Sequence, residues 1–184
     1  MQLSESRAPA LPRSTSPNLS EVFPYVQVGG RWSLPDEFLH AFAEQMQREG
    51  VFRRVFYNGL PQGGFLAEMQ KPSNLPVFLF KESTPVGVAW LNGIRSGVAF
   101  AHFCGLRACR GFSAEIGQAA LGYWFGAFPF LHVLMGTVPA TNRLAVRFIQ
   151  RLGFTVLGEV PGMLYDAYED RRVGGVIAHY VRKH

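Results

Sequence analysis

The sequence predicts one domain of the α/β (α+β) class, built on a mixed and mostly antiparallel sheet of six to seven strands. Three observations predict it. The chain has 184 residues, of which 48% are hydrophobic and 17% charged, a composition that suits one domain with a sizeable core. Apolar runs of strand length follow one another through short turns in the middle of the chain. Segments with helical periodicity separate the other runs.

The N-terminal part is expected to contain a tail, a strand and a helix. Residues 1–20 are rich in serine and proline and have no hydrophobic periodicity, so we expect a flexible tail before a single domain over residues 21–184. Residues 21–29 predict a first strand, and residues 34–50 predict a helix that ends at a glycine. Between residues 51 and 75 the pattern is weak.

The middle of the chain predicts an antiparallel meander followed by a crossover. Residues 75–82, 86–94 and 98–106 are strand-like and are joined by short turns. Residues 111–128 predict a helix that leads to another strand at 131–138. Because a helix connects strands 98–106 and 131–138, these two are expected to be parallel. The helix carries three glycines whose missing side chains would permit close packing: Gly117, Gly122 and Gly126.

The stretch VPATNRLAVRFIQRLGF, residues 138–154, predicts an amphipathic helix. Asn142 or Thr141 is a suitable N-cap, and Gly153 is placed to end the helix. Apolar residues that recur with the helical period are expected to face the sheet: Leu144, Ala145, Phe148, Ile149 and Leu152. Arginines stand at four-residue intervals on the other side, which by itself indicates a solvated face: Arg143, Arg147 and Arg151.

Spacing within this helix resembles motif B of the GNAT superfamily of acyl-CoA-dependent N-acetyltransferases. That motif has an asparagine, an alanine three positions on, an apolar residue at six and Gly-Phe at eleven and twelve, and five residues match it: Asn142, Ala145, Phe148, Gly153 and Phe154. With two closing strands at 154–160 and 173–183, the resemblance covers about residues 131–160 by motif and about 76–182 by order of elements. It looks nearest to the branch that acetylates the N-termini of ribosomal proteins.

The resemblance implies a fold and a co-substrate. Helices would cover both faces of a sheet that is splayed between its fourth and fifth strands, here 98–106 and 131–138. Acetyl-CoA would enter the splay and give its acetyl group to a primary amine, either a protein N-terminus or a small molecule. A catalytically inactive GNAT-fold binding or assembly module with a degenerate coenzyme loop is the alternative. The resemblance also leaves a homodimer open.

The pyrophosphate of the coenzyme is expected on the turn after residues 98–106, where the free N–H groups of a helix N-terminus attract anions. Arg110 matches the Arg/Gln position of the family's phosphate motif, but Ser113 and Glu115 replace its two small residues. Alternatively the loop is shifted, and Gly111 makes the close approach. The resemblance assigns coenzyme binding to this turn and to the following amphipathic helix: Gly105, Leu106, Arg107, Arg110, Gly111, Phe112, Ser113, Asn142, Arg143 and Arg147.

Catalysis by the implied mechanism requires a neutral amine, a polarised thioester oxygen and a protonated leaving thiolate. The resemblance puts a backbone N–H near Cys104–Leu106 on the thioester, and His102 on the same strand is a candidate base. More distant candidates for the base are Glu82 and Glu159. An ordinary core or edge histidine is the other interpretation of His102, and a small buried residue that of Cys104.

The usual general acid of the family is a tyrosine seven positions after the motif-B asparagine, and Ile149 stands there in this chain. Tyr165 and Tyr168 would be within reach if residues 161–172 folded over the cleft. The resemblance and the strand position together leave three catalytic candidates: His102, Cys104 and Tyr165.

Charge and composition limit the other functional classes. The net charge of +5 suits an anionic partner, but no block of five or six basic residues occurs, so nucleic-acid binding ranks last. The two cysteines and five histidines have no metal-ligand spacing, and no metal site is expected. We find no apolar signal segment and no apolar run of membrane-spanning length. The expectation is therefore a cytoplasmic protein without a membrane partner.

Overall fold

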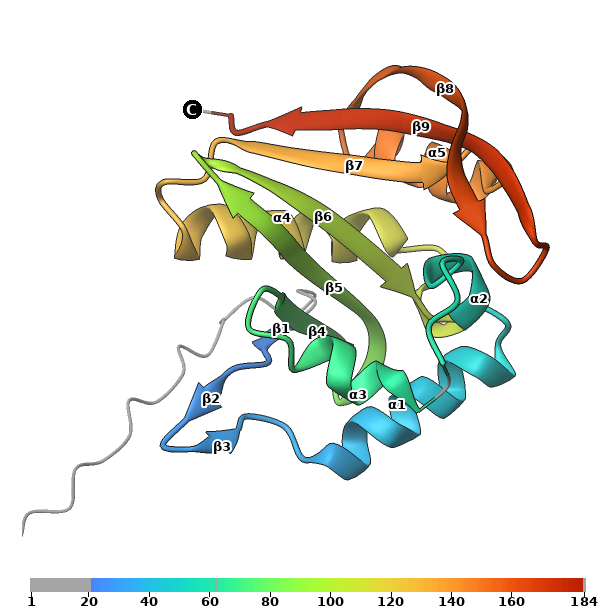
Figure 1. Cartoon of the computed structure of the whole chain (residues 1–184). Coiled ribbons are helices and arrows are strands. Elements are labelled where there is room, and N and C mark those ends of the chain that lie inside the picture. Colours follow the sequence, from blue (N-terminus) through green and yellow to red (C-terminus); the bar gives the residue numbers. More distant parts are fainter. Residues whose placement is uncertain (1–20, 62, 184) are drawn as a thin grey trace, which may run out of the picture.

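The computed structural model describes residues 21–61 and 63–183, and its main feature is a seven-stranded sheet with helices on both faces (Figure 1). The expected tail of residues 1–20 lies outside the described residues. The N-terminal elements are β1 (Glu21–Pro24), β2 (Gln27–Val28), β3 (Arg31–Trp32), α1 (Asp36–Arg48), α2 (Phe52–Val55) and α3 (Gly64–Met69). The central elements are β4 (Leu75–Lys81), β5 (Thr84–Arg95), β6 (Val98–Gly105), a 3-10 turn (Arg107–Cys109) and α4 (Ser113–Ala127). The last elements are β7 (Val133–Pro139), α5 (Arg143–Arg151), β8 (Thr155–Asp166) and β9 (Arg171–Val181).

The sheet is mixed and mostly antiparallel, as the sequence predicts. Its strands lie in the order β1-β4-β5-β6-β7-β9-β8, and every neighbouring pair is antiparallel except β6 and β7. The parallel pair arises because α4 carries the chain across one face of the sheet between these two strands. A separate antiparallel ribbon is formed by β2 and β3.

Two hydrophobic cores lie on opposite faces of the sheet, because successive side chains of a strand alternate between its faces. On β5, Ala89 and Leu91 belong to the core beneath α4 and α5. Val88 and Trp90 belong to the core beneath α1, α2 and α3. The helices on both faces therefore agree with the fold that the resemblance implied.

The predicted splay between the fourth and fifth strands of the sheet is present. The parallel pairing of β6 with β7 involves only residues 98–100 and 133–135. Beyond these pairs β6 continues alongside β5 as far as Gly105, and β7 continues alongside β9 as far as Pro139. The two strands diverge, and the facing edge of each is left without a strand partner within the described chain.

Local signals determine both ends of α5. The Oδ1 atom of Asn142 accepts the Ala145 N–H at 3.2 Å, which confirms the predicted N-cap. After the last turn, Gly153 has a φ of +94°, and the Phe154 N–H donates to the Ile149 carbonyl at 3.0 Å. A left-handed glycine followed by such a bond is the Schellman ending of a helix.

One residue of the predicted apolar face of α5 is misplaced. Leu144 is 67% exposed, because it lies at the edge of the stripe that packs on the sheet. Ile149 and Leu152 are buried as expected. The side chains of the arginine row are exposed, in agreement with a solvated face: Arg143, Arg147 and Arg151.

Several predicted boundaries are wrong. The first strand, expected over residues 21–29, ends at Pro24 as the edge strand β1, and residues 27–28 form β2 of a separate ribbon. The weakly patterned segment 51–75 contains two short helices, α2 and α3. Residues 161–172, expected as a loop, are mostly the continuation of β8 and the start of β9. Glycines with positive φ accompany two shifts of register in β8, which break the alternation by which a strand is predicted.

Candidate active site

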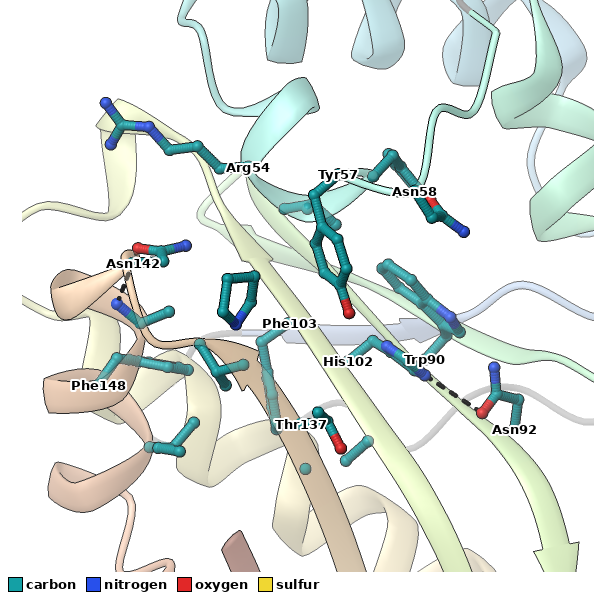
Figure 2. A pocket seen from close by; sticks show the side chains of 18 of the residues that line it. Arg54, Tyr57, Asn58, Trp90, Asn92, His102, Phe103, Thr137, Asn142 and Phe148 are labelled. Carbon is teal, nitrogen blue, oxygen red and sulfur yellow. Dashed lines mark hydrogen bonds between the residues drawn. The ribbon is translucent and has the colours of Figure 1, made fainter. Parts of the chain in front are cut away.

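The splay between β6 and β7 opens into a cavity of about 220 Å³, which we call the splay cavity. Its walls come from α2 and the loop after it, from α3, from β5, β6 and β7, and from the start of α5 (Figure 2). Polar and aromatic side chains line it together: Arg54, Tyr57, Asn58, Glu68, Trp90, Asn92, His102, Phe103, Thr137, Asn142 and Phe148. The open edges of two strands and several titratable groups thus meet in one place.

His102 is held in the splay cavity by two residues of β5. Trp90 is its cross-strand partner, and the two rings stack with centroids 4.8 Å apart. The imidazole Nε2 lies 3.2 Å from Asn92 Oδ1 (Figure 2). Since an amide oxygen only accepts, Nε2 carries the proton and Nδ1 is left as an acceptor. Burial lowers the pKa of His102 to about 4, against the opposing charge of Glu68, so the ring is neutral at pH 7.

Tyr57 brings a phenol to the same place from the loop after α2. Its hydroxyl points into the splay cavity, toward His102 (Figure 2). No residue in the described part of the chain forms a hydrogen bond with this hydroxyl, whereas the Tyr57 carbonyl accepts the Ala167 N–H at 2.8 Å. Burial raises the pKa of the phenol above its ordinary value. Tyr57 is therefore a protonated and available hydrogen-bond donor.

The turn between β8 and β9 folds onto the loop after α2. Besides the bond from Ala167 to Tyr57, the Tyr168 hydroxyl donates to the Leu60 carbonyl at 3.3 Å. The guanidinium of Arg53 lies 5.0 Å from the centre of the Tyr168 ring, a cation–π distance. This part of the hairpin therefore lies beside the loop that carries Tyr57.

The tyrosine expected from that hairpin nevertheless lies outside the splay cavity. Tyr165 is 48% exposed, and its hydroxyl donates to Asp170. Tyr165 lies in the paired part of β8, opposite Arg172 of β9. This pairing fixes the direction of its side chain, so the side chain cannot turn into the cavity as it could from a loop. Tyr168 does not line the splay cavity, and neither do the more distant candidates for the base, Glu82 and Glu159.

The open edge of β6 offers different backbone donors from those expected. The Leu106 N–H donates to the Val86 carbonyl at 2.9 Å, and by alternation the Cys104 N–H also faces β5. The N–H groups of Phe103 and Gly105 therefore face the splay. The Cys104 thiol lies in the core beneath α1, α2 and α3, and burial raises its pKa, so it is no nucleophile at neutral pH. The structure thus favours the interpretation of Cys104 as a small buried residue.

The turn after β6 leads into an open helix N-terminus. Gly111 has a φ of +93°, and α4 begins at Ser113 without a side-chain cap. The N–H groups of Gly111 and of residues 113–115 have no acceptor among the residues that the structure describes. The Arg107 N–H, by contrast, donates to the carboxylate of Glu49. This geometry favours the shifted alignment, in which Gly111 makes the close approach.

Cationic side chains surround this turn. Arg107 and Arg110 are exposed, and Lys81 Nζ lies 4.1 Å from the centre of the Phe112 ring. Their charges add to the partial positive charge at the start of α4. The turn can therefore attract an anionic group, and Glu115, in the first turn of α4, is exposed to solvent.

At the other end of the splay cavity, Asn142 is the residue of α5 that the sequence singled out. Its side chain caps the helix and also lines the cavity (Figure 2). Arg143 and Arg147 are exposed and do not line it. The structure therefore brings Asn142 and His102 together in one cavity, and leaves these two arginines at its outer surface.

Sequence reasoning missed much of the splay cavity, including the residues around His102. Tyr57 and Glu68 lie in the weakly patterned segment, where no periodicity predicts which side chains face inward. Trp90 and Asn92 could have been found from the meander, since a short turn between strands 86–94 and 98–106 sets the register that brings them beside His102.

Within residues 21–61 and 63–183, no three His, Cys, Asp or Glu side chains lie close enough to hold a metal ion. Cys104 and Cys109 are free and buried. No helix in this part of the chain is both long and apolar enough to cross a membrane.

Comparison with known proteins places the fold. No protein-family model matches the sequence, and no curated protein matches it. Solved acetyltransferase structures do match. The acetyl transferase from Salmonella typhimurium that modifies the N-terminal serine of the 50S ribosomal subunit protein L7/L12 has a TM-score of 0.72 at 11% identity, with 92% of this chain and 97% of that chain covered.

Two further structures extend the likeness. A GNAT-family acetyltransferase from Bacillus anthracis has a TM-score of 0.60 at 16% identity, covering 79% of this chain and 87% of its own. The microcin C7 self-immunity acetyltransferase MccE, solved with acetyl-CoA and AMP, has a TM-score of 0.58 at 15% identity, covering 78% and 88%. At these identities the likeness concerns the arrangement of helices and strands. This chain has the fold of the GNAT acetyltransferases.

Proposed function

We propose that this chain transfers an acetyl group from acetyl-CoA to a primary amine. The observation that carries the proposal is the splay cavity, whose open strand edge leads into a helix N-terminus with free N–H groups. An open strand edge can bind an extended chain through its backbone groups, and a free helix N-terminus attracts phosphate. The like fold of MccE, which was solved with acetyl-CoA, supports the choice of co-substrate.

The coenzyme lies along the splay in this proposal. Its pyrophosphate accepts hydrogen bonds from the N–H groups of Gly111 and residues 113–115, near the side chains of Arg107 and Arg110. Its pantetheine passes between β6 and β7 toward Asn142. Arg143 and Arg147 are exposed on α5, where a phosphate of the adenosine end can reach them from solvent.

His102 accepts the proton of the attacking amine. As the C–N bond forms, the nitrogen becomes cationic, and in the tetrahedral intermediate it is a much stronger acid than the free ammonium ion. The pKa of about 4 keeps the imidazole unprotonated at neutral pH, so Nδ1 can accept this proton, directly or through water. The N–H of Phe103 or Gly105 stabilises the oxyanion of the intermediate.

Tyr57 protonates the leaving group. As the C–S bond breaks, the phenol gives its proton to the thiolate sulfur, and the phenolate then recovers a proton from the imidazolium through water. Atoms and charges therefore balance over one turnover. The role normally assigned to a tyrosine at the position of Ile149 is thus filled from the opposite wall of the splay cavity.

Two measurements test the proposal. Acetyl-CoA is expected to raise the Tm of the protein in a saturable manner, and a panel of primary amines is expected to release CoA thiol. If acetyl-CoA and CoA both leave the Tm unchanged, the proposal is wrong. A shift in Tm without thiol release would favour the inactive binding module, and retention on DNA that weakens steeply with salt would favour a nucleic-acid partner.

The inactive module is the second candidate, and one contact of Glu49 favours it. The Glu49 carboxylate accepts the Arg107 N–H at the start of the turn 107–112, which we call the phosphate turn, so this N–H is not free for a phosphate. For the active enzyme, the acceptor is a protein N-terminus or a small molecule. A cytoplasmic location and a homodimer remain predictions from the sequence. Measurement of the molecular size in solution tests the homodimer.

A further inference from the structure

We infer that Glu68 forms an acceptor subsite that takes up an amine as its ammonium ion and disfavours acceptors with a carboxylate beside the amine. The bound ammonium ion gives one proton to water before its neutral nitrogen attacks the thioester. This inference deepens the proposed function and depends on it for the use of the site. Nothing in the sequence pattern pointed to Glu68, which lies on α3 in the weakly patterned segment.

Glu68 is the one acidic side chain among the residues that line the splay cavity. Glu68 comes from α3, which packs on the face of the sheet that α1 and α2 also cover, whereas Asn142 begins α5, which packs on the opposite face. If the coenzyme occupies the Asn142 end, Glu68 lies at the end left for the acceptor. Its charge acts on the same space as the ring of His102, whose pKa it affects.

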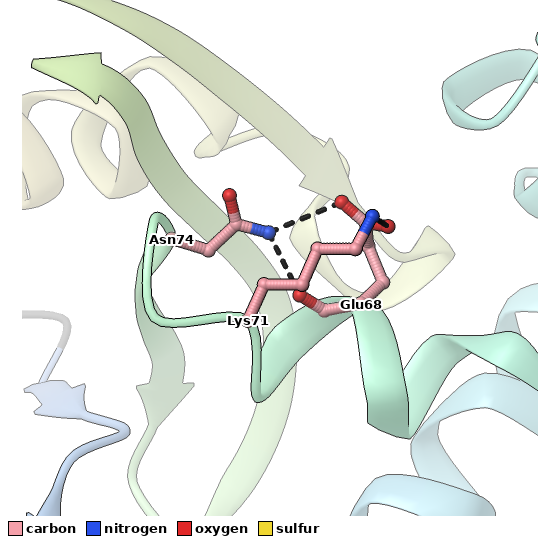
Figure 3. Close-up of polar contacts among 3 residues, drawn as sticks. All are labelled: Glu68, Lys71 and Asn74. Atoms are coloured by element: carbon pink, nitrogen blue, oxygen red, sulfur yellow. Dashed lines mark hydrogen bonds and ion pairs between the residues drawn. The ribbon is translucent and has the colours of Figure 1, made fainter.

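The carboxylate is held in place by two neighbours (Figure 3). Asn74, which is only 6% exposed, donates from Nδ2 to Glu68 Oε1 at 3.1 Å and to the Glu68 carbonyl at 2.7 Å. Lys71 Nζ lies 2.5 Å from Oε2. Each carboxylate oxygen has two acceptor sites, so both oxygens can accept a further N–H. The side chain is 18% exposed, which leaves it accessible from the cavity.

Lys71 does not cancel the charge that an incoming ammonium ion meets. Its side chain is 56% exposed, and an ion pair with an exposed partner contributes little because water screens it. Glu68 shares the cavity with the neutral His102 and the aromatic rings of Trp90 and Tyr57. The cation of the lining, Arg54, extends on the Asn142 side of the view in Figure 2. In such surroundings a carboxylate attracts an ammonium group and repels a second carboxylate.

Glu68 could instead serve only to tie the turn before β4, and the test must separate the two roles. Glu68→Gln removes the charge and keeps an oxygen that Asn74 can reach. Lys71→Met removes the cation paired with Glu68, so the electrostatic potential around the carboxylate becomes more negative. A purely structural role predicts that both variants change activity in the same direction. An electrostatic role predicts opposite directions.

The experiment compares glycinamide with glycine, which differ in having a neutral amide or a carboxylate beside the amine. The measured quantity is the ratio of kcat/KM for the two amines, from CoA thiol release. Differences in amine basicity cancel when this ratio is compared between variants. We expect Glu68→Gln to lower the preference for glycinamide about tenfold, because the variant no longer repels the carboxylate of glycine, and Lys71→Met to raise it. An unchanged ratio in Glu68→Gln, or a shift of both variants in one direction, overturns the inference.

Binding of glycinamide to the CoA-loaded protein separates this inference from the proposed function. If the wild type releases no thiol with any amine but its Tm rises with glycinamide, and Glu68→Gln loses that rise, the subsite stands and the proposed reaction fails. If thiol is released but the glycinamide effects are the same in Glu68→Gln, the reaction stands and the subsite fails. If the wild type neither binds glycinamide nor releases thiol, both are wrong.

Discussion

Gly117 on α4 lies directly against Leu152 at the end of α5. A Cβ atom at Gly117 would be 2.5 Å from Leu152 Cδ2 and 3.0 Å from Phe148 Cζ. Beside this contact, Gln118 Nε2 donates to the Leu152 carbonyl at 2.9 Å. The helix that begins at the phosphate turn is thereby fixed to the helix that begins at Asn142. The spacing of the two ends of the proposed coenzyme site therefore depends on a glycine without any chemical role.

Replacing Gly117 by alanine is expected to destabilise the protein by about 1–2 kcal/mol, because the new methyl group overpacks a filled contact. Gly122→Ala in the same helix is the matched control. It is exposed, a Cβ there would meet nothing within 4 Å, and alanine is expected to stabilise the helix by about 0.5–1 kcal/mol. Urea unfolding measures both. Of the three glycines predicted to allow close packing in α4, only Gly117 meets a close neighbour, and equal effects of the two variants would contradict this assignment.

Asn142→Ala is expected to weaken acetyl-CoA binding roughly tenfold, the effect of losing one good hydrogen bond to the ligand. Arg151→Ala, at the other end of α5, is expected to change the Kd less than twofold, on the order of 0.4 kcal/mol, because Arg151 is exposed and lines no part of the splay cavity. The loss of the N-cap should also cost about 1 kcal/mol of stability. Titration well below both Tm values keeps that effect out of the comparison, and equal Kd values would speak against this placement of the coenzyme.

Tyr57→Phe is expected to lower kcat about a hundredfold, the usual size of a general-acid contribution, and to leave the Kd for acetyl-CoA unchanged. Tyr168→Phe is the control, because it removes a phenol from the neighbouring hairpin that contacts the Leu60 carbonyl and faces no part of the splay cavity. Thiol-release kinetics with one amine measure both variants. If they lose activity equally, the proton donor is not Tyr57.

The partly buried imidazole of His102 predicts a dependence of stability on pH. Its pKa is about 4 in the folded chain and 6.5 is its ordinary value, so between these pH values the unfolded chain binds a proton that the folded chain does not. The contribution to stability is complete above pH 6.5 and is lost as the pH falls toward 4, by on the order of 3 kcal/mol. His102→Phe keeps an aromatic ring beside Trp90 and cannot titrate. Urea unfolding at several pH values should show a smaller loss in the variant, and parallel curves would refute the argument.

The part of the site on α5 could be predicted because its signals are local. Asn142 caps the helix, Gly153 ends it, and the spacing between them suffices to indicate the helix and its resemblance to motif B. Leu144 shows the limit of this reasoning, since periodicity does not decide where an apolar stripe ends. Packing against the sheet decides that.

The other wall of the site could not be predicted, for a physical reason. The helices α2 and α3 have four and six residues, too few for stability on their own. They form because Phe52, Phe65 and Met69 are buried against the sheet. Tyr57 and Glu68 therefore take their positions from tertiary packing, which leaves no periodic trace in the sequence.

The hydrogen bond from Ala167 to the Tyr57 carbonyl has a mechanical consequence. At one end the two halves of the sheet are joined by the short pairing of β6 with β7, and at the other by this bond between the hairpin and the loop after α2. The splay between β6 and β7 is thus closed at both ends, and the contact between Ala167 and Tyr57 must break before the splay can widen. The rate of hydrogen exchange at the Ala167 amide would then report how often this end of the splay opens, even before any ligand is known.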